Sequence, residues 1–195
     1  MEKIIAFGNS SYKDVAKIWL RHMSKLDLLK KVIIITLDNE IKEEISNFNV
    51  ESFDAPYDIK SNGLKEFWKL RCEIFLEIYE KYGSFIHSDL DAIWLKNPLD
   101  YLKKIEGDLL FSQGTIHPRN VYEKFGFVAC CGFFQVNESK ASKLFLKKLI
   151  ADVNSTQDDQ VSINNIFFKN SLYFKFRDIY FENVTLKNGE SFQIK

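Results

Sequence analysis

FIHSDLDAIWL, residues 85–95, is the stretch that decides the fold of this chain. It has the composition of a buried strand that is interrupted by Asp89 and Asp91. Side chains of an extended backbone alternate sides with period two, so both carboxylates are expected to point the same way. Neighbouring carboxylates in a buried strand repel each other and lose hydration, which disfavours ionising both. We therefore predict a shared divalent cation that also holds phosphate oxygens. The alternative is a strand that ends at a solvent-facing turn.

The rest of the chain alternates strand-like and helix-like segments, the pattern of an α/β fold. The predicted strands are residues 3–7, 32–37, 50–53, 108–112 and 127–136. The predicted helices are residues 14–29, 39–47, 64–82, 139–153 and 160–168, with a helical turn over 98–105 and a loop over 114–126. Short strands are expected from Leu172 onward, with a turn at Asn188-Gly189. Without a repeat or a flexible linker, residues 1–195 are predicted to form a single domain.

The composition, 46% hydrophobic and 28% charged, is that of a globular protein. Basic and acidic residues balance at 27 each, which gives no indication of nucleic acid or a membrane surface as partner. No stretch approaches the roughly 20 apolar residues of a membrane helix, and the apolar run near Met1 is too short for a signal peptide. Cys72, Cys130 and Cys131 are odd in number, and two are adjacent. We therefore expect reduced, packed thiols in a cytoplasmic protein.

Arg71 is the first candidate outside the aspartate motif. It falls within a helical stripe of apolar side chains, formed by Leu64, Trp68, Phe75, Ile78 and Tyr82. A buried guanidinium needs an anionic partner, and a diphosphate or a carboxylate matches its planar geometry. A side chain that reaches the surface and a purely structural ion pair are the open alternatives.

Two further segments carry candidate ligand groups. The loop with Asn9, Ser10 and Tyr12 follows the first predicted strand, where open α/β sheets usually bind ligands. It offers amide and aromatic groups to a nucleobase, and the next helix offers N–H groups to an anion; a capped turn explains it almost as well. Asp158 and Asp159 lie where a predicted helix begins, so a capping role is the simpler interpretation. His87 is a candidate contact of Asp89.

Together these features resemble the GT-A nucleotide-diphospho-sugar glycosyltransferases, and among them the group that includes plant xylosyl- and arabinosyltransferases. The motif that carries the resemblance is SDLDAIWLKNP, residues 88–98, which looks like that group's DxD segment with its Asn-Pro turn. Supporting matches follow in the expected order: Asn9, Leu37-Asp38, residues 132–137, and Asp159-Gln160 with Asn164. The resemblance covers about residues 3–189.

The resemblance implies a Rossmann-like, mixed and mainly parallel sheet with helices on both faces. It also implies sugar transfer from a nucleotide-diphosphate donor, most often UDP, to a glycan or other hydroxyl acceptor, with a weak lean towards retention of configuration. The residues it assigns are Asp89 and Asp91 to Mn²⁺ or Mg²⁺; Asn9, Ser10, Tyr12, Asp38, Arg71 and Asp89 to the donor; and Gly132 and Phe133 to the acceptor side. Asp159 and Gln160 would line the reacting sugar, with Asp159 orienting the acceptor hydroxyl or acting as general base.

One departure from the family pattern concerns the metal. Such enzymes usually supply a third ligand, commonly His, from near the C-terminus, whereas no His follows His117 here. Either the chain is truncated, another group or water completes the site, or metal affinity is weak. Two other functions remain open: a haloacid-dehalogenase-type phosphatase with Asp89 as nucleophile and Asp91 as acid/base, and a nucleotide-sugar-binding module without turnover. The oligomeric state is open as well.

Overall fold

The computed structural model describes residues 2–114 and 116–168, together with the backbone of four short strands near the C-terminus. These strands pair as two antiparallel ribbons and are β7 (Phe176–Arg177), β8 (Tyr180–Phe181), β9 (Val184–Thr185) and β10 (Ser191–Phe192). The predicted turn at Asn188-Gly189 lies outside the described residues.

Six strands form one mixed sheet with the order β3-β2-β1-β4-β6-β5. Their bounds are β1 (Lys3–Gly8), β2 (Val32–Thr36), β3 (Glu51–Asp54), β4 (Phe85–Ser88), β5 (Leu109–Gln113) and β6 (Ala129–Val136). β1 pairs in parallel with β2 and β4, and β2 in parallel with β3, whereas β6 runs antiparallel between β4 and β5. The predicted α/β class and mainly parallel sheet are confirmed.

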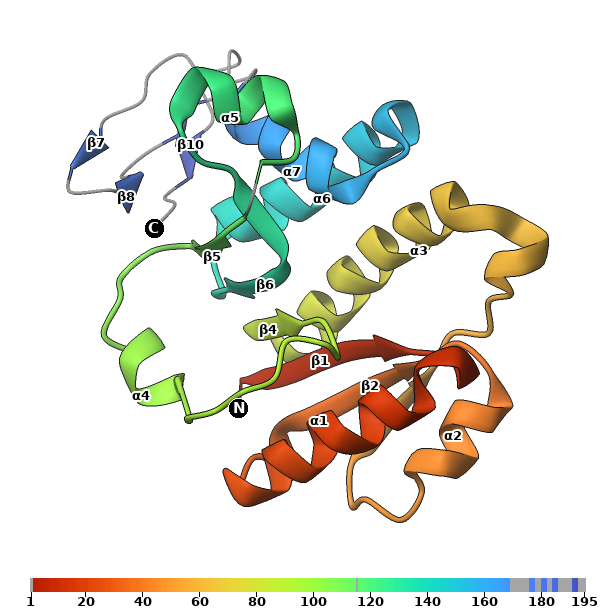
Figure 1. Ribbon diagram of the computed structural model, residues 1–195. Coiled ribbons are helices and arrows are strands. Elements are labelled where there is room, and N and C mark those ends of the chain that lie inside the picture. Colours follow the sequence, from red (N-terminus) through yellow and green to blue (C-terminus); the bar gives the residue numbers. More distant parts are fainter. Residues whose placement is uncertain are drawn as a thin grey trace.

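Helices cover both faces of this sheet (Figure 1). Their bounds are α1 (Lys13–Lys25), α2 (Asn39–Ile45), α3 (Ile59–Tyr82), α4 (Leu99–Leu102), α5 (Arg119–Phe125), α6 (Lys140–Thr156) and α7 (Asp159–Phe168), with short 3-10 turns at Ser10–Tyr12 and Leu29–Lys31. Neighbouring residues of β1 face opposite layers: Ile4 packs with Trp19 of α1, and Ile5 packs with Phe75 of α3. Burial on both faces explains the continuous apolar run of β2.

The segment after β4 corrects one prediction. β4 ends at Ser88, so Asp89 and Asp91 do not lie on a strand, and alternation along a strand does not place them. The backbone N–H of Ala92 donates to the carbonyl of Asp89 at 3.1 Å, which starts a turn. Of the apolar residues that follow, Ile93 and Trp94 pack into the α1 side of the core without strand pairing, whereas Leu95 is 81% exposed; Trp94 Nε1 donates to Ser88 Oγ at 3.0 Å. Their apolar character therefore reflects burial of an irregular segment.

Two helix predictions need correction as well. The segment 114–126, expected to be a loop, contains α5, which follows Pro118 and ends at Gly126 in the left-handed conformation. Pro before the first turn and Gly at the C-terminus are a normal helix pattern that a loop assignment overlooks. α3 is kinked at Gly63, and Leu64 is 54% exposed, not part of the buried stripe.

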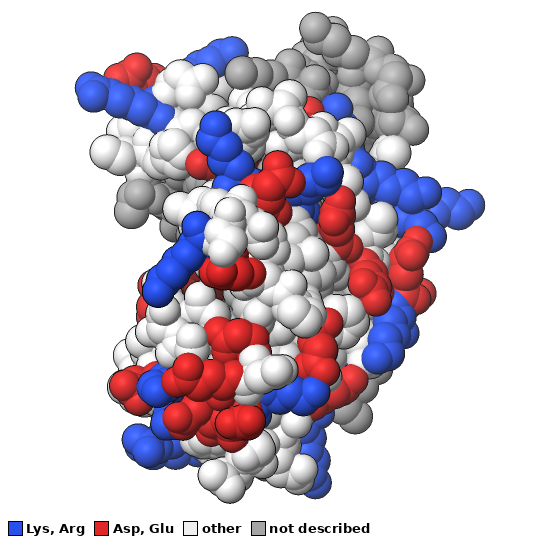
Figure 2. Space-filling view, turned by 90° about the vertical axis from the view of Figure 1, so that its right-hand side faces the viewer, with Lys and Arg blue, Asp and Glu red and all other residues white. Residues whose placement is uncertain are grey.

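The surface carries both signs of charge. Figure 2 shows basic and acidic side chains interspersed, with acidic ones gathered in the lower half of that view. Ion pairs join α1 to α2, among them Lys13 with Glu40 and Lys17 with Glu44. Among the described residues, no helix is both long and apolar enough to span a membrane.

Candidate functional site

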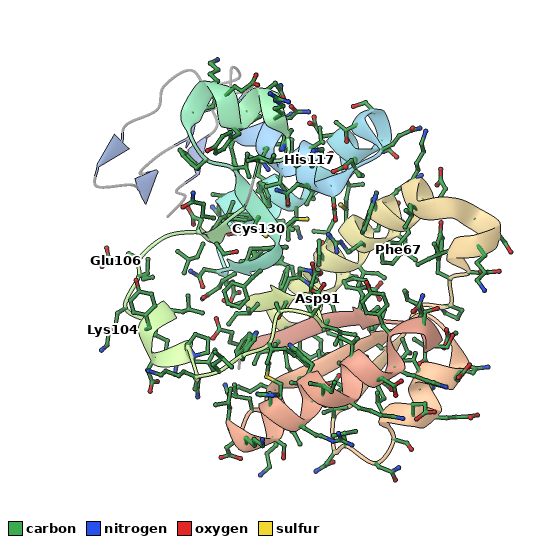
Figure 3. The ribbon with its side chains drawn as sticks, viewed as in Figure 1. Phe67, Asp91, Lys104, Glu106, His117 and Cys130 are labelled. Carbon is green, nitrogen blue, oxygen red and sulfur yellow. The ribbon has the colours of Figure 1, made fainter. Side chains whose placement is uncertain are left out.

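A pocket opens at the carboxyl ends of β1 and β4, bordered by α3. Its polar lining consists of Asn9, Tyr12, Arg71, Asp89 and Asp91, and its apolar walls include Leu64, Phe67 and Trp68. Figure 3 shows Asp91 near the middle of the molecule, between Phe67 of α3 and Cys130 of β6. An adjoining hollow shares Asn9 and adds Ser10 and Asp38. The predicted donor and metal residues therefore come together at one edge of the sheet.

Arg71 lies at the base of this pocket and is only 5% exposed, which excludes a side chain that reaches bulk solvent. Its Nε donates to Asp159 Oδ2 at 2.5 Å, and its Nη2 also pairs with that carboxylate oxygen. The remaining contacts are Nη2 to Cys131 Sγ at 3.0 Å and Nη1 to Asp89 Oδ1 at 3.3 Å. Burial acts to lower the pKa of Arg71, but Asp159 and the other anionic neighbours raise it above its ordinary value. The guanidinium is charged, and each of its three nitrogens has a partner.

Asp89 is held from three sides. Its backbone N–H donates to Gly132 O at 2.7 Å, which continues the pairing of β4 with β6. Its Oδ1 contacts Arg71 and lies 3.1 Å from His87 Nε2. Burial acts to raise the pKa of Asp89, but the His87 hydrogen bond and the charge of Arg71 hold it below the ordinary value, so the carboxylate is ionised. Burial lowers the pKa of His87, so its ring is neutral.

Asp91 differs from Asp89 because it is exposed and its carboxylate has no hydrogen bond or ion pair within the described part of the chain. Hard carboxylate oxygens suit Mg²⁺ or Mn²⁺, which usually retain water and bind substrate phosphates. The donor set of Asp91 and Asp89 Oδ2 therefore fits such a cation. Across residues 2–114 and 116–168, no group of three His, Cys, Asp or Glu side chains is placed to hold a metal ion. The two carboxylates would need ligands from the substrate or water.

The first loop is anchored through Asp38. Asp38 caps α2, since its Oδ1 accepts from the N–H of Ile41 at 2.8 Å, and its Oδ2 accepts from the N–H of Ser10 at 2.7 Å. Burial acts to raise the pKa of Asp38, but these backbone donors hold it below the ordinary value. In contrast, the buried Oδ1 of Asn9 has no partner among the described residues. Asp38 therefore shapes the loop, and Asn9 has a free acceptor.

Gln160 and Asn164 of α7 bind the backbone of β6. Gln160 Oε1 accepts from Cys131 N at 2.7 Å, and its Nε2 donates to the carbonyls of Ala129 and His117. Asn164 accepts from Ala129 N and donates to Ala129 O, each at 2.9 Å. These amides take the place of a neighbouring strand along the start of β6. The capping carboxylate of α7 is Asp158, whose Oδ1 accepts from Val161 N at 2.8 Å.

The acceptor-side prediction falls on β6 beside Asp89. A Cβ atom on Gly132 would lie 2.6 Å from Asp89 Oδ2, so the absence of a side chain there makes room for that carboxylate. Phe133 belongs to the core layer on the α1 side of the sheet and packs edge-on against Trp94, with ring centroids 5.5 Å apart. Of these two residues, Gly132 is the one in contact with the carboxylate of the DxD segment.

Sequence reasoning missed two contacts of Arg71. Trp68 lies three residues earlier, and the guanidinium carbon sits 4.7 Å from its ring centroid, a cation–π contact. The i, i+3 spacing on a predicted helix was a usable signal for it. Cys131 comes from a distant strand, and burial raises the pKa of its thiol well above the ordinary value. No sequence pattern indicated that contact.

The fold is GT-A-like, because solved glycosyltransferases superpose on it. The galactosyltransferase LgtC, solved with donor and acceptor sugar analogues, superposes with a TM-score of 0.58 at 12% identity, covering 84% of this chain and 69% of that one. The glycosyltransferase GlyE of Streptococcus pneumoniae TIGR4 gives 0.53 at 12% identity, covering 87% and 44%. At these identities the likeness concerns the fold.

Sequence comparison gives the family. The nucleotide-diphospho-sugar transferase family matches residues 27–179, well over half of the chain. Arabinosyltransferase XEG113 of Arabidopsis thaliana is 25% identical over 167 residues, which cover 76% of this chain and 26% of that protein. The chain belongs to the nucleotide-diphospho-sugar transferase family, and it spans about a quarter of the length of this plant relative.

Proposed function

We propose that this chain is a metal-dependent glycosyltransferase that moves a sugar from a nucleoside-diphosphate donor, UDP-sugars being the first candidates, to a glycan or other hydroxyl acceptor. The observation that carries the proposal is the charge of the pocket. Arg71, its basic residue among the described side chains, is already paired with Asp159 and Asp89, while Asp91 is unpaired. Carboxylates are therefore in excess. A donor diphosphate needs additional positive charge to bind there, and a divalent cation supplies it.

Each side of the pocket has a role in this proposal. Asp89 and Asp91 hold the cation, which when bound neutralises the leaving diphosphate as the glycosidic bond breaks. Asn9, whose buried Oδ1 has no partner among the described residues, lines the same pocket as the half-exposed ring of Tyr12, and that ring offers the base a stacking surface. Trp68 and Phe67 close the apolar side and exclude water from the donor.

In this proposal, Asp159 and Gln160 shape the part of the pocket where the reacting sugar binds. Asp159 is 2% exposed, with Oδ2 bound to Arg71 and Oδ1 accepting from the N–H of Gln160 at 2.8 Å. With its two carboxylate oxygens engaged in this way, Asp159 orients Arg71. The general-base role predicted for Asp159 requires that an acceptor hydroxyl reach its Oδ1, which the Gln160 N–H shares.

Calorimetric titration tests the proposal with UDP, GDP and ADP, each with and without Mn²⁺. We expect UDP to bind only with Mn²⁺, and Asp91→Asn to weaken that binding at least tenfold at unchanged melting temperature, because its carboxylate makes no structural contact. Asp100→Asn is the matched control, since Asp100 is a 91% exposed carboxylate of α4. Mn²⁺-dependent binding that survives in Asp91→Asn would contradict the assignment.

Turnover separates the remaining alternatives. UDP binding without hydrolysis or transfer of any UDP-sugar would favour a binding module. Hydrolysis of a simple phosphomonoester without any nucleotide would favour the dehalogenase-type phosphatase, which the family membership does not support.

A further inference from the structure

We propose that His87 is a positioning residue that fixes the carboxylate of Asp89 for cation binding at the expense of the stability of the empty protein; this inference rests on the proposed function. His87 lies in β4, is 0% exposed, and its Nε2 is 3.1 Å from Asp89 Oδ1. Its ring does not reach the pocket surface, so it acts on the ligand through Asp89.

The direction of this hydrogen bond follows from the chemistry of the two groups. An ionised carboxylate only accepts hydrogen bonds, so the proton between them belongs to Nε2 of His87. The other ring nitrogen, Nδ1, is then a bare acceptor. It is buried and has no partner among the described residues. Leaving a buried acceptor unpaired costs stability.

The surroundings of the ring make this cost unusual. Three phenylalanines surround His87, with ring centroids 5.8 Å away for Phe7, 5.0 Å for Phe75 and 5.3 Å for Phe134. A cage of this kind suits an apolar side chain better than an imidazole. Packing therefore does not explain the histidine, whereas its hydrogen bond to Asp89 does.

That bond determines which oxygen of Asp89 remains available. Both polar side-chain contacts, from His87 and from Arg71, fall on Oδ1. Gly132 leaves room for Oδ2, which has no hydrogen bond within the described residues. His87 thus holds one oxygen and leaves the other for a cation. Groups that orient metal-binding carboxylates typically contribute tenfold to hundredfold to metal affinity.

The test compares His87→Phe and His87→Gln by melting temperature without ligand and by calorimetric Mn²⁺·UDP titration. His87→Phe removes both the donor and the unpaired acceptor, and Asp89 keeps Arg71 and solvent, since its side chain is 41% exposed. We expect its melting temperature to rise by about 2–4 °C, while Mn²⁺·UDP binding weakens about tenfold to hundredfold. His87→Gln retains a donor and a buried acceptor, so binding should stay near that of the unchanged protein without a gain in stability. His87→Met replaces His87→Phe if the larger ring does not fit.

Phe134→Leu is the matched control, because it loosens the same cage without removing a polar group. It should lower the melting temperature and leave binding nearly unchanged. Unchanged binding in His87→Phe would overturn the inference, and so would a parallel loss of stability and binding, which indicates a packing role. Absence of Mn²⁺·UDP binding by the unchanged protein would overturn the proposed function together with this inference. Equal Mn²⁺·UDP binding by the unchanged protein and by His87→Phe would overturn this inference alone.

Discussion

The buried ion pair between Arg71 and Asp159 gives the most quantitative prediction. Their side chains are 6% and 3% exposed, and they join α3 to the start of α7. Removing one partner of such a pair leaves an uncompensated buried charge, which typically costs about 3–5 kcal/mol. Because Asp89 remains 3.3 Å from the guanidinium, Asp159→Leu should fall at the lower end, about 3 kcal/mol. For a chain of this size that corresponds to a melting temperature lower by about 6–12 °C.

The double variant distinguishes this account from simple packing damage. Arg71→Met with Asp159→Leu removes both charges, and apolar replacement of a buried pair is often neutral or even stabilising. Urea denaturation should therefore give the double variant a smaller loss than either single variant. The exposed pair Lys13–Glu40 is the control, where the same charge removals should change stability little. If the two single losses add to within about 0.5 kcal/mol in the double variant, the pair is not coupled and the reasoning is refuted.

Three further predictions test the rest of the site. Gly132→Ala should weaken Mn²⁺·UDP binding at least tenfold in calorimetry, because its Cβ would meet the carboxylate of Asp89; Gly126→Ala, with φ of 78° and open space around it, should instead lower only the stability, by about 1 kcal/mol. Asn164→Ala should cost about 1–3 kcal/mol in urea denaturation, because the buried N–H of Ala129 loses its partner, whereas the carbonyl of Ala129 keeps Gln160 Nε2; a loss below about 0.5 kcal/mol would speak against a stabilising role of this amide. Cys130 is partly exposed, whereas burial raises the pKa of the other two thiols, so thiol labelling at pH 8 should modify Cys130 alone in the native protein, and Cys130→Ser should abolish that reaction.

Much of the fold was predictable because its buried strands and its helices have different hydrophobic patterns in the sequence. Buried strands such as 32–36 are continuous apolar runs, and α1 and α6 carry apolar stripes at helical spacing. The prediction that the strand continues beyond Ser88 through Ile93 and Trp94 is wrong for a physical reason. Apolar residues that fill a core from an irregular segment have the same composition as a strand, and composition does not report whether a neighbouring strand is available for pairing.

The sequence indicated which residues meet at this edge of the sheet, but not the contacts that they make there. The aspartate motif and the loop with Asn9 point to one sheet edge, because the carboxyl ends of parallel strands meet there. The partner of Arg71 was open, since a diphosphate and a carboxylate satisfy a guanidinium equally well. Asp159, 88 positions away in the sequence, is that partner. Only the packing of α7 against α3 and β6 brings the two together.

The residues of the site differ in how many hydrogen-bond partners they already have within the protein. Side chains with many partners shape the pocket, and side chains with unpaired atoms are the candidates for binding a ligand. Gln160 makes three hydrogen bonds to backbone groups, and Asp38 uses both oxygens on backbone N–H groups. Each has little capacity left, so replacing either should first disturb the shape of the pocket. Asn9 and Asp91 are the opposite case, because each has an oxygen without a partner in the described part of the chain, buried in Asn9 and exposed in Asp91. A buried polar atom without a partner, such as Oδ1 of Asn9, costs stability, whereas the exposed carboxylate of Asp91 is hydrated and open to a ligand. The cation is therefore expected to depend most directly on Asp91, whereas Arg71 acts through the contacts that it already makes with Asp159, Cys131 and Asp89.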